Sequence, residues 1–575
     1  TNSIATPSVA PLSDVLRMLP IMRPASPWEK GAILFRSIDG KPMPYQPGSS
    51  LQTTWIDIVY ARPGSGKSVL SNAINLALCL SPGLKNLPII SIIDIGPSSS
   101  GLISLIQESL PKGERHYAAY HRLRMTNDYA INPFDTQLGA RYPTPQERSF
   151  LVNFLILLAT PVGSAKTYDG VSDMAGLIVD EVYKGLSDEY NPNKYTQGID
   201  EEIDTVLANC KFQSSNDITW WQVTDFLFEQ HEVHHAKLAQ RYAVPVLSDV
   251  SSSCRASAIS DLFGKIIVST GENLIDAFGR MISSSVREYP VLAQITKFDL
   301  GDAKIVSLDL DEVAKTGGEA ADRQTAVMYM LARYILAKDF YMNIENLSGF
   351  PEKYKDYHKT RIIENKEVPK RIVFDEFHRT SKVKAVRDQV VVDMREGRKW
   401  NVQVALLSQS LDDFDSVMIE FATSIFIMDS GPIQAVEKTA SIFGLTPTQK
   451  KALRTQVHGP REGGGTFLAQ FATKKGIYTQ LLTNTIGPIE LWAFSTTSTD
   501  VRVRDELYDR IGPKMARAIL AHMFPGGSVA PLVEQRLLAL RKSGGVSSDS
   551  SQSILKGLIE EIVKEFNTNP LFRKH

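Results

Sequence analysis

YARPGSGKSVLSNAINLALC, residues 60–79, is the stretch from which the fold of this chain can be inferred. It matches the end of the pattern G-x-x-x-x-G-K-[ST] with Gly66, Lys67 and Ser68, but it has Ala61 in place of the first glycine. An apolar segment precedes it, and apolar residues follow at helical spacing. Such a loop turns backbone N–H groups toward an anion at the positive end of a helix. The stretch therefore predicts a phosphate-binding turn between a strand and a helix.

Each residue type in this turn suits that chemistry. Gly64 and Gly66 permit a close approach of the backbone, Lys67 offers an ammonium to the β and γ phosphates, and the Ser68 hydroxyl suits Mg²⁺. We expect Ala61 to be tolerated as a small turn residue. The alternative is a chance match in an ordinary strand–helix turn. The predicted nucleotide-binding residues are Ala61, Arg62, Pro63, Gly64, Ser65, Gly66, Lys67, Ser68 and Val69, with ATP and Mg²⁺ as the ligands.

A nucleotide site of this kind also needs an acidic residue at the end of a second apolar strand. RIVFDEF, residues 371–377, provides one, since three apolar residues lead directly into Asp375 and Glu376. We expect Asp375 to hold Mg²⁺ together with Ser68, and Glu376 to polarise the attacking water. A rival is IVSLDLDE, where acids alternate with leucines and therefore point to opposite faces of a strand. The rival acids are Asp309, Asp311 and Glu312.

Polar and basic residues near the acidic pair complete the predicted site. NVQVALLSQS (401–410) reads as the next strand and ends in Gln409, which can sense the γ-phosphate or orient water. The alternative for Gln409 is a strand-capping amide. A helical stretch before that strand carries basic residues that could act across a subunit boundary, or that could simply be a solvated helix end. These trans candidates are Arg395, Arg398 and Lys399.

Composition excludes several classes of protein. The 575 residues carry 63 Lys plus Arg against 64 Asp plus Glu, a net charge of −1, which disfavours a surface built for nucleic acid. The three cysteines are far apart, so they indicate no disulfide framework and no zinc knuckle. The apolar runs are shorter than a membrane-spanning helix requires. Because the sequence starts with Thr, we also expect that an upstream region has been removed.

Strand-like and helical segments alternate along the chain, which predicts an α/β fold with a mostly parallel sheet. GAILFRSIDGKPMPY (31–45) predicts a hairpin at Asp39-Gly40, ELWAFS (490–495) predicts a late strand, and SGGVSSDSSQS (543–553) predicts a flexible linker. The expected units are an N-terminal extended segment with the hairpin (1–50), the first part of the core (51–135), a mostly helical insertion (136–286), the second part of the core (287–500) and a helical tail (501–575).

FEQHEVHHAKL, residues 228–238, spells H-E-x-x-H through His231, Glu232 and His235. On a helix the two histidines would share a face and could bind zinc, with the glutamate as a base. Polar neighbours crowd the motif and no third ligand is evident. We therefore favour an exposed polar helix over a metal site.

The combination of motifs resembles a known group. The loop lies about 310 residues before IVFDE, with a helical insertion between them, as in the conjugation and type IV secretion ATPases related to the FtsK/HerA motors. Several stretches look closer to the IcmB/DotO (TraU-like) ATPases of type IVB secretion. They are INPFDTQLGARYPTPQER (131–148), YPVLAQITKFDLGDAKIVSLDLDEVA (289–314), RIVFDEFHR (371–379) and REGRKWNVQVALLSQSLDDF (395–414).

The resemblance implies a RecA-like P-loop core that acts as a hexameric ATPase at the cytoplasmic face of the bacterial inner membrane. It further implies ATP and Mg²⁺ as ligands, other secretion components as neighbours and protein substrates. It also implies that the chain is the C-terminal motor, with Lys67 and Ser68 at the phosphates, Asp375 and Glu376 in hydrolysis and Gln409 as sensor. Ala61 departs from the loop pattern. Two other functions stay open: a DNA-pumping motor, and a nucleotide-gated assembly module without turnover.

Overall fold

The computed structural model describes residues 9–18, 26–164, 166–213, 217–429, 431–461, 463–542 and 550–572. In these residues the strands form an 11-stranded sheet in the order β2-β1-β11-β10-β9-β3-β8-β7-β4-β6-β5. The strands are β1 (Ile33–Ser37), β2 (Pro42–Tyr45), β3 (Ile56–Tyr60), β4 (Ile89–Asp94), β5 (Ala118–Arg122), β6 (Ile305–Asp309), β7 (Lys370–Phe374), β8 (Val402–Ser408), β9 (Ser424–Ile427), β10 (Gly465–Thr473) and β11 (Gly476–Asn484).

The sheet has a parallel part and an antiparallel part. All neighbours from β9 to β5 in that order pair in parallel, whereas β10, β11, β1 and β2 extend the sheet in antiparallel fashion. The α/β class with a mostly parallel sheet is confirmed. The hairpin at Asp39-Gly40 is confirmed as well, because β1 pairs with β2 and Gly40 has the positive φ, 83°, that such turns favour.

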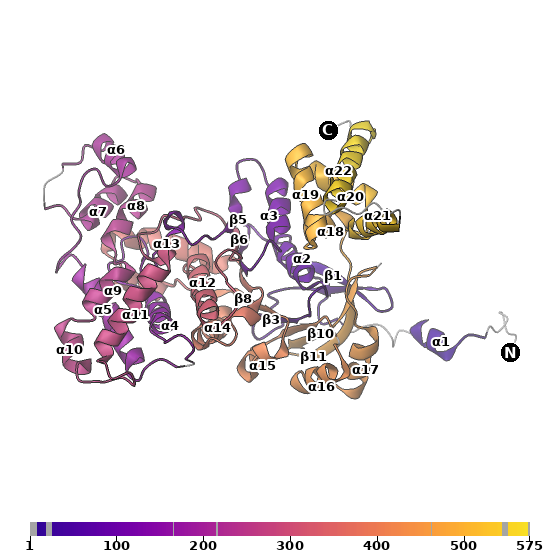
Figure 1. Ribbon diagram of the computed structural model, residues 1–575, viewed down its shortest axis with the longest axis horizontal. Helices are drawn as coiled ribbons and strands as arrows, with labels where there is room; N and C mark the ends of the chain where they lie inside the picture. The colour runs from indigo at the N-terminus through magenta and orange to yellow at the C-terminus, as the bar shows by residue number, and fades with distance from the viewer. Residues whose placement is uncertain are drawn as a thin grey trace.

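The helices fall into groups that follow the chain (Figure 1). They are α1 (Leu12–Met18), α2 (Lys67–Cys79), α3 (Ser100–Ser109), α4 (Pro145–Leu158), α5 (Val171–Gly185), α6 (Glu201–Asn209), α7 (Trp220–Glu229), α8 (Val233–Ala243), α9 (Leu247–Ser253), α10 (Ser257–Phe263), α11 (Leu274–Glu288), α12 (Glu319–Ala337), α13 (Glu352–Glu367), α14 (Lys384–Glu396), α15 (Ser416–Phe421), α16 (Ile433–Ile442), α17 (Pro447–Gln456), α18 (Pro488–Ala493), α19 (Ser498–Ile511), α20 (Pro513–Met523), α21 (Ala530–Lys542) and α22 (Ser550–Thr568). No helix in the described ranges is both long and apolar enough to span a bilayer.

Side chains of the central strand β3 enter two separate cores, because alternate residues of a strand point to opposite faces. Ile56 and Ile58 belong to a core shared with α4, α12 and α14. Val59, together with Ala61 just after the strand, belongs to a second core shared with α2 and α3. The sheet is therefore covered by helices on both faces, and the phosphate loop leaves β3 toward the α2 face.

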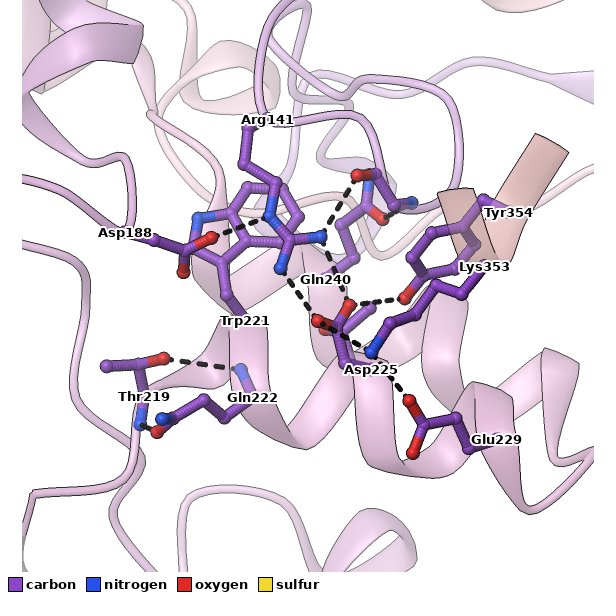
Figure 2. Close-up of polar contacts among 12 residues, drawn as sticks. Arg141, Asp188, Thr219, Trp221, Gln222, Asp225, Glu229, Gln240, Lys353 and Tyr354 are labelled. Atoms are coloured by element: carbon purple, nitrogen blue, oxygen red, sulfur yellow. Dashed lines mark hydrogen bonds and ion pairs between the residues drawn. The ribbon is translucent and has the colours of Figure 1, made fainter. Parts of the chain in front are cut away.

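Helices α4 to α11 connect β5 to β6 and gather at one end of the molecule with α13 (Figure 1). Within this group α6, α7 and α8 have a core of their own, in which the adjacent Trp220 and Trp221 are buried. An arginine-centred network ties this small core to the rest: Arg141 stacks over Trp221 at 4.5 Å and forms an ion pair with Asp225 at 2.9 Å (Figure 2). Tyr354 of α13 donates to the same carboxylate at 2.6 Å.

The C-terminal helices α18 to α22 lie beside α3, away from the helical end of the molecule (Figure 1). Gly101 of α3 is required at this contact, because a Cβ there would lie 1.6 Å from the Ala493 carbonyl oxygen. The strand expected at 490–495 is wrong. Pro488 at the first helical position favours α18 instead, and Trp492 is buried in the core of the C-terminal helices. The expected linker partly lies outside the described residues, at 543–549, and its last residues begin α22.

Candidate nucleotide-binding site

The phosphate loop joins the buried end of β3 to α2. Ala61 continues the parallel pairing beyond the strand, since its N–H donates to the Ser408 carbonyl oxygen at 3.1 Å. Its φ lies outside the left-handed region, so the methyl group imposes no strain there. Gly64 and Gly66, by contrast, have φ values of 80° and 88°, which favour glycine. The turn therefore depends on the last two glycines and accommodates alanine at the first position.

The side chains of the loop divide into exposed and buried ones. Arg62 and Pro63 are exposed, Ser68 and Val69 are half-buried, and Lys67 is buried. Lys67 is the first residue of α2, where the helix dipole and free N–H groups favour an anion. The Lys67 side chain points from this helix end toward the acidic residues that follow β7.

Asp375 and Glu376 both contact Lys67. The Lys67 Nζ lies 2.9 Å from Asp375 Oδ1 and forms a second ion pair with Glu376 Oε1. The contact arises because β8 alone separates β3 from β7, so the carboxyl ends of all three strands meet at one edge of the sheet. The side chain of Asp375 is 4% exposed and that of Glu376 is 21% exposed. Because these groups are shielded from water, removing the charge of one would leave its partner without compensation.

Gln409 reaches the same cluster from the end of β8. Its Nε2 donates to Glu376 Oε2 at 2.8 Å, so three neighbouring strands supply the lysine, the acidic pair and the amide. His378 Nδ1 lies 3.2 Å from the same carboxylate oxygen. Glu376 itself has a φ of 52°, an unusual value for a residue with a side chain, which costs about 1–2 kcal/mol. Backbone strain of this kind is common at functional sites.

The charges of this cluster shift the pKa values of Lys67 and Glu376. Burial alone would lower the pKa of Lys67, but the carboxylates of Asp375 and Glu376 raise it above the ordinary value. Burial would likewise raise the pKa of Glu376, but Lys67 holds it below the usual range. The cluster therefore contains a protonated lysine and an ionised glutamate at neutral pH. An ionised glutamate beside an amide donor has the protonation of a general base.

The rival acids occupy a different position. Asp309 ends β6, which β4 separates from β7. Its carboxylate is fully buried and accepts hydrogen bonds from the Tyr120 hydroxyl at 2.6 Å and from Arg122 Nε at 3.0 Å. It also accepts from the Gly96 and Asp311 N–H groups. Asp311 and Glu312 are exposed. Asp309 thus holds together the loops that follow β4 and β6. The acids after β7, by contrast, face the phosphate loop.

The three basic trans candidates lie near the amino end of β8, at the opposite end of the strands from the phosphate loop. Arg395 ends α14, and Arg398 and Lys399 lie in the short 3-10 helix Gly397–Trp400 that precedes β8. Arg398 donates to the Thr53 carbonyl oxygen, and Lys399 lies over the Trp400 ring at 4.8 Å. All three are exposed. Because β8 runs from these residues to Gln409, they are about 20 Å from the phosphate loop of their own chain.

Arg62 has a partner within its own chain. Its Nε lies 2.5 Å from Asp429 Oδ2, and Asp429 also accepts a hydrogen bond from the Ser65 hydroxyl at 3.4 Å. Asp429 follows β9, the other neighbour of β3. Asp429 therefore borders the loop. Pro460 borders it too, because the Pro460 Cγ lies 3.4 Å from the position that a Cβ on Gly66 would take. Neither residue was predicted as part of the site.

Asp94 and Ser98 were also missed. Asp94 ends β4, next to β7, and burial together with the Asp375 charge raises its pKa well above the ordinary value. Ser98 donates to Asp94 and also approaches Asp375. The signal for Asp94 was present in the sequence, since it follows a continuous apolar run in LPIISIIDIG, as Asp375 does in RIVFDEF.

The H-E-x-x-H motif does not form a single helix, so the expected exposed helix across it is wrong. His231 has a φ of 64°, and α8 begins only at Val233, with Glu232 as its N-cap residue. Glu232 contacts His235 Nδ1 at 2.8 Å. Among the described residues no group of three His, Cys, Asp or Glu side chains could hold a metal ion.

The residues around Lys67 suit Mg²⁺ bound together with phosphates. Mg²⁺ takes oxygen ligands and is usually held by one or two carboxylates plus substrate phosphates and waters. The hydroxyl of Ser68 at the start of α2 and the carboxylate of Asp375 offer oxygen atoms of this kind. Asp375 Oδ1 forms an ion pair with Lys67 Nζ at 2.9 Å, so this carboxylate already faces a cation at the edge where the phosphate loop lies.

Comparison with solved structures shows structural likenesses. The chain is similar to the structure of VirB4 of Thermoanaerobacter pseudethanolicus, with a TM-score of 0.49 and 13% sequence identity, over 81% of this chain and 99% of that chain. No protein-family model matches the chain. No curated protein matches it either.

Proposed function

We propose that this chain is a P-loop ATPase that binds ATP with Mg²⁺ and hydrolyses it. The observation that carries the proposal is the meeting of Lys67, the acidic pair Asp375 and Glu376, and Gln409 at the ends of three adjacent parallel strands. A chance glycine-rich turn gives no reason for a distant acidic pair and an amide to converge on its lysine. Arg62, Pro63 and Val69 complete the loop around the phosphates.

In the proposed reaction Lys67 leaves the acidic pair and donates to the β and γ phosphates. Ser68 and Asp375 would hold Mg²⁺, which supplies positive charge against the phosphate oxygens. Glu376, freed from Lys67, accepts a proton from the attacking water, and Gln409 fixes its carboxylate through the 2.8 Å hydrogen bond. The lysine thus neutralises the carboxylates before nucleotide arrives and the phosphates afterwards.

We further propose that the ATPase powers a type IV secretion system, and within this group one of the type IVB kind. The support is the resemblance of the four stretches between residues 131 and 414 to the IcmB/DotO ATPases. Two of these stretches contain the acidic pair and Gln409. The proposal includes a homo-hexamer at the cytoplasmic face of the inner membrane, other secretion components as neighbours and protein substrates.

ATP turnover by the purified chain tests the enzymatic part. Glu376→Gln should retain binding of a fluorescent ATP analogue while turnover falls by about 10²- to 10⁴-fold, the usual contribution of a general base. Lys67→Ala should lose binding. If turnover in Glu376→Gln equals that of the unchanged chain, the assignment of the base is wrong. An assembled ring of unchanged chain without turnover would favour a nucleotide-gated module.

The motor part needs two further measurements. Mass determination with an ATP analogue and Mg²⁺, beside Lys67→Ala, tests whether nucleotide drives ring formation. Turnover with and without DNA separates a protein-secretion motor from a DNA pump, since strong and salt-sensitive stimulation by DNA would contradict the former. The trans candidates are tested one at a time with Arg395→Ala, Arg398→Ala and Lys399→Ala. A residue acts in trans if its replacement lowers turnover only at protein concentrations where the ring forms.

A further inference from the structure

The loop between β4 and α3 runs beside the acidic strand end. It comprises residues 95–99, and its backbone is fixed from two sides: Gly96 N–H donates to Asp309 at 2.8 Å, and Ser99 N–H donates to Asp94 at 3.2 Å. β4 is the neighbour of β7 on the side away from the phosphate loop. The loop therefore approaches Asp375 from the side opposite to Lys67.

The Ser98 hydroxyl lies between two carboxylates. It is hydrogen-bonded to Asp94 Oδ2 and lies 3.4 Å from Asp375 Oδ2. A serine hydroxyl has one proton to donate, so the two carboxylates compete for it. Here the contact with Asp94 is the closer of the two. The other oxygen of Asp375, Oδ1, accepts from Lys67 and, at 2.8 Å, from the Glu376 N–H.

Ser98 is also attached to the helix that carries the phosphate loop. Asn72 is buried in α2, four residues after Ser68, and its Nδ2 donates to the Ser98 carbonyl oxygen at 2.9 Å. Residues four apart share one face of a helix. The side of α2 that carries the Ser68 hydroxyl is thereby connected to the loop that contacts Asp375. A displacement of the start of α2 can therefore be transmitted to Ser98 through the hydrogen bond from Asn72.

We propose that Ser98 is a positioning residue that holds Asp375 once Lys67 has moved to the phosphates. The proposal rests on the proposed function and deepens it, because it concerns how the carboxylate is kept in place for Mg²⁺. With Lys67 gone, Asp375 Oδ1 keeps only the hydrogen bond from the Glu376 N–H, and the carboxylate can turn about this single contact. Donation from Ser98 to Oδ2 then fixes the plane of the carboxylate, with Oδ1 directed toward the phosphate loop.

A purely structural role for Ser98 makes a different prediction. If Ser98 served only to hold the loop by its hydrogen bond to Asp94, its loss would lower stability and leave the metal dependence unchanged. Hydrogen bonds to metal-binding carboxylates, by contrast, change metal affinity or activity by about 10- to 100-fold. The metal dependence therefore separates the two roles.

The test compares Ser98→Ala and Ser98→Gly, which remove the hydroxyl, with Ser98→Thr, which keeps it. The matched control is Ser100→Ala, because Ser100 begins α3 directly after the loop and donates to the Pro97 carbonyl oxygen at 2.8 Å. Two quantities are measured: the Mg²⁺ concentration that gives half-maximal turnover, and the affinity for Mn²⁺ by electron paramagnetic resonance with a non-hydrolysable ATP analogue. Analogue binding in EDTA and the melting temperature are recorded for each variant.

We expect Ser98→Ala and Ser98→Gly to weaken Mn²⁺ binding and to raise the half-maximal Mg²⁺ concentration by roughly tenfold, with analogue binding in EDTA unchanged. Ser98→Thr should recover most of the loss, and Ser100→Ala should match the unchanged chain. The proposal is overturned if Ser98→Ala and Ser98→Gly both bind Mn²⁺ as tightly as the unchanged chain. It is also overturned if Ser98→Thr loses as much Mn²⁺ affinity as they do.

Failure of the proposed function looks different. It would appear as absent analogue binding or absent turnover in the unchanged chain, with no dependence on Ser98. If the unchanged chain binds nucleotide without turnover, the Mn²⁺ affinities still decide the role of Ser98. If it binds no nucleotide, Asp375 has no phosphate-bound metal to hold, and the proposal for Ser98 is wrong as well.

Discussion

The ammonium of Lys67 lies 2.9 Å from a carboxylate oxygen of Asp375, so the cation of the phosphate loop is already bound by the acidic strand end. In the proposed function a nucleotide competes with two carboxylates for this lysine, since Glu376 pairs with it too. We expect this competition to lower the affinity of the chain for phosphate. It also means that the phosphate loop and the acidic strand end, the two halves of the proposed site, are in direct contact.

Asp375→Asn should therefore tighten nucleotide binding in the absence of metal. The substitution removes one of the two negative charges that hold Lys67, and a charge-assisted bond contributes about 1.5–3 kcal/mol, so we expect affinity to rise by roughly tenfold in EDTA. Turnover with Mg²⁺ should be lost in the same variant. Titration with a fluorescent ATP analogue measures the first effect.

Asp311→Asn is the matched control for this variant, because Asp311 is exposed and carries the same charge near the same edge of the sheet. It should leave binding in EDTA unchanged. Equal affinities for Asp375→Asn and the unchanged chain would show that the ion pair does not compete with phosphate.

Gln409→Ala should lower turnover without weakening nucleotide binding. The Gln409 amide donates to Glu376 Oε2 at 2.8 Å and makes no ion pair with Lys67, so its loss disorders the base and leaves the phosphate contacts in place. Misplacing a reacting group by about 1 Å can cost about 10²-fold in rate. Steady-state kinetics should show a lower kcat at a similar KM. Ser410→Ala, one residue away, is the control, and a fall in both variants alike would point to a general change in the strand end.

Much of this site could be predicted from the sequence because its parts are local. The apolar run before Gly66, the helical spacing after it and the acidic pair after RIVF each follow from periodicity. The position of Gln409 followed from the same reasoning. What periodicity cannot give is the order of strands in the sheet, and it is the order β3-β8-β7-β4 that brings Lys67, Asp375 and Asp94 to one edge.

The errors have local physical causes. Glu490 to Ser495 read as a strand because aromatic and β-favouring residues cluster there, but Pro488 sets a helical φ at the start of α18 and the tertiary core accepts Trp492 from a helix. The H-E-x-x-H spacing presumed one continuous helix. A left-handed residue at His231 ends that continuity, and nothing in the identity of a histidine indicates such a conformation.

Glu147→Gln should make stability less dependent on pH between 5 and 8. Glu147 is in the first turn of α4 and is buried, and burial raises its pKa to about 7. Its folded-state pKa is above the unfolded value, so its contribution to stability is full below pH 4.5 and is lost as the pH rises through 7. The glutamine is neutral at every pH and keeps an oxygen that can accept from the Thr144 N–H.

Melting temperatures across this range check the prediction. The stability of Glu147→Gln relative to the unchanged chain should increase from pH 5 to pH 8, by at most about 3 kcal/mol at the upper end. Glu352→Gln is the control, because Glu352 begins α13 and is exposed. A difference between Glu147→Gln and the unchanged chain that stays constant with pH would contradict the pKa.

Asp225→Asn should detach the core of α6, α7 and α8 from the rest of the molecule. Asp225 accepts two hydrogen bonds from Arg141 and one from Tyr354, and Lys353 lies 3.4 Å away (Figure 2). The pair is partly buried, with Arg141 13% and Asp225 20% exposed, so we expect loss of the Asp225 charge to cost about 1.5–3 kcal/mol. Asp188 binds the same arginine at 2.9 Å but is 48% exposed, so Asp188→Asn should cost less than about 1 kcal/mol.

Thermal unfolding gives the two costs, and limited proteolysis shows whether cleavage in Asp225→Asn begins within residues 201–243. Nucleotide binding should be unchanged in both variants, because α7 lies at the end of the molecule away from α2 (Figure 1). Equal, small losses of stability in the two variants would mean that the cation–π contact between Arg141 and Trp221 holds this unit in place without the carboxylate.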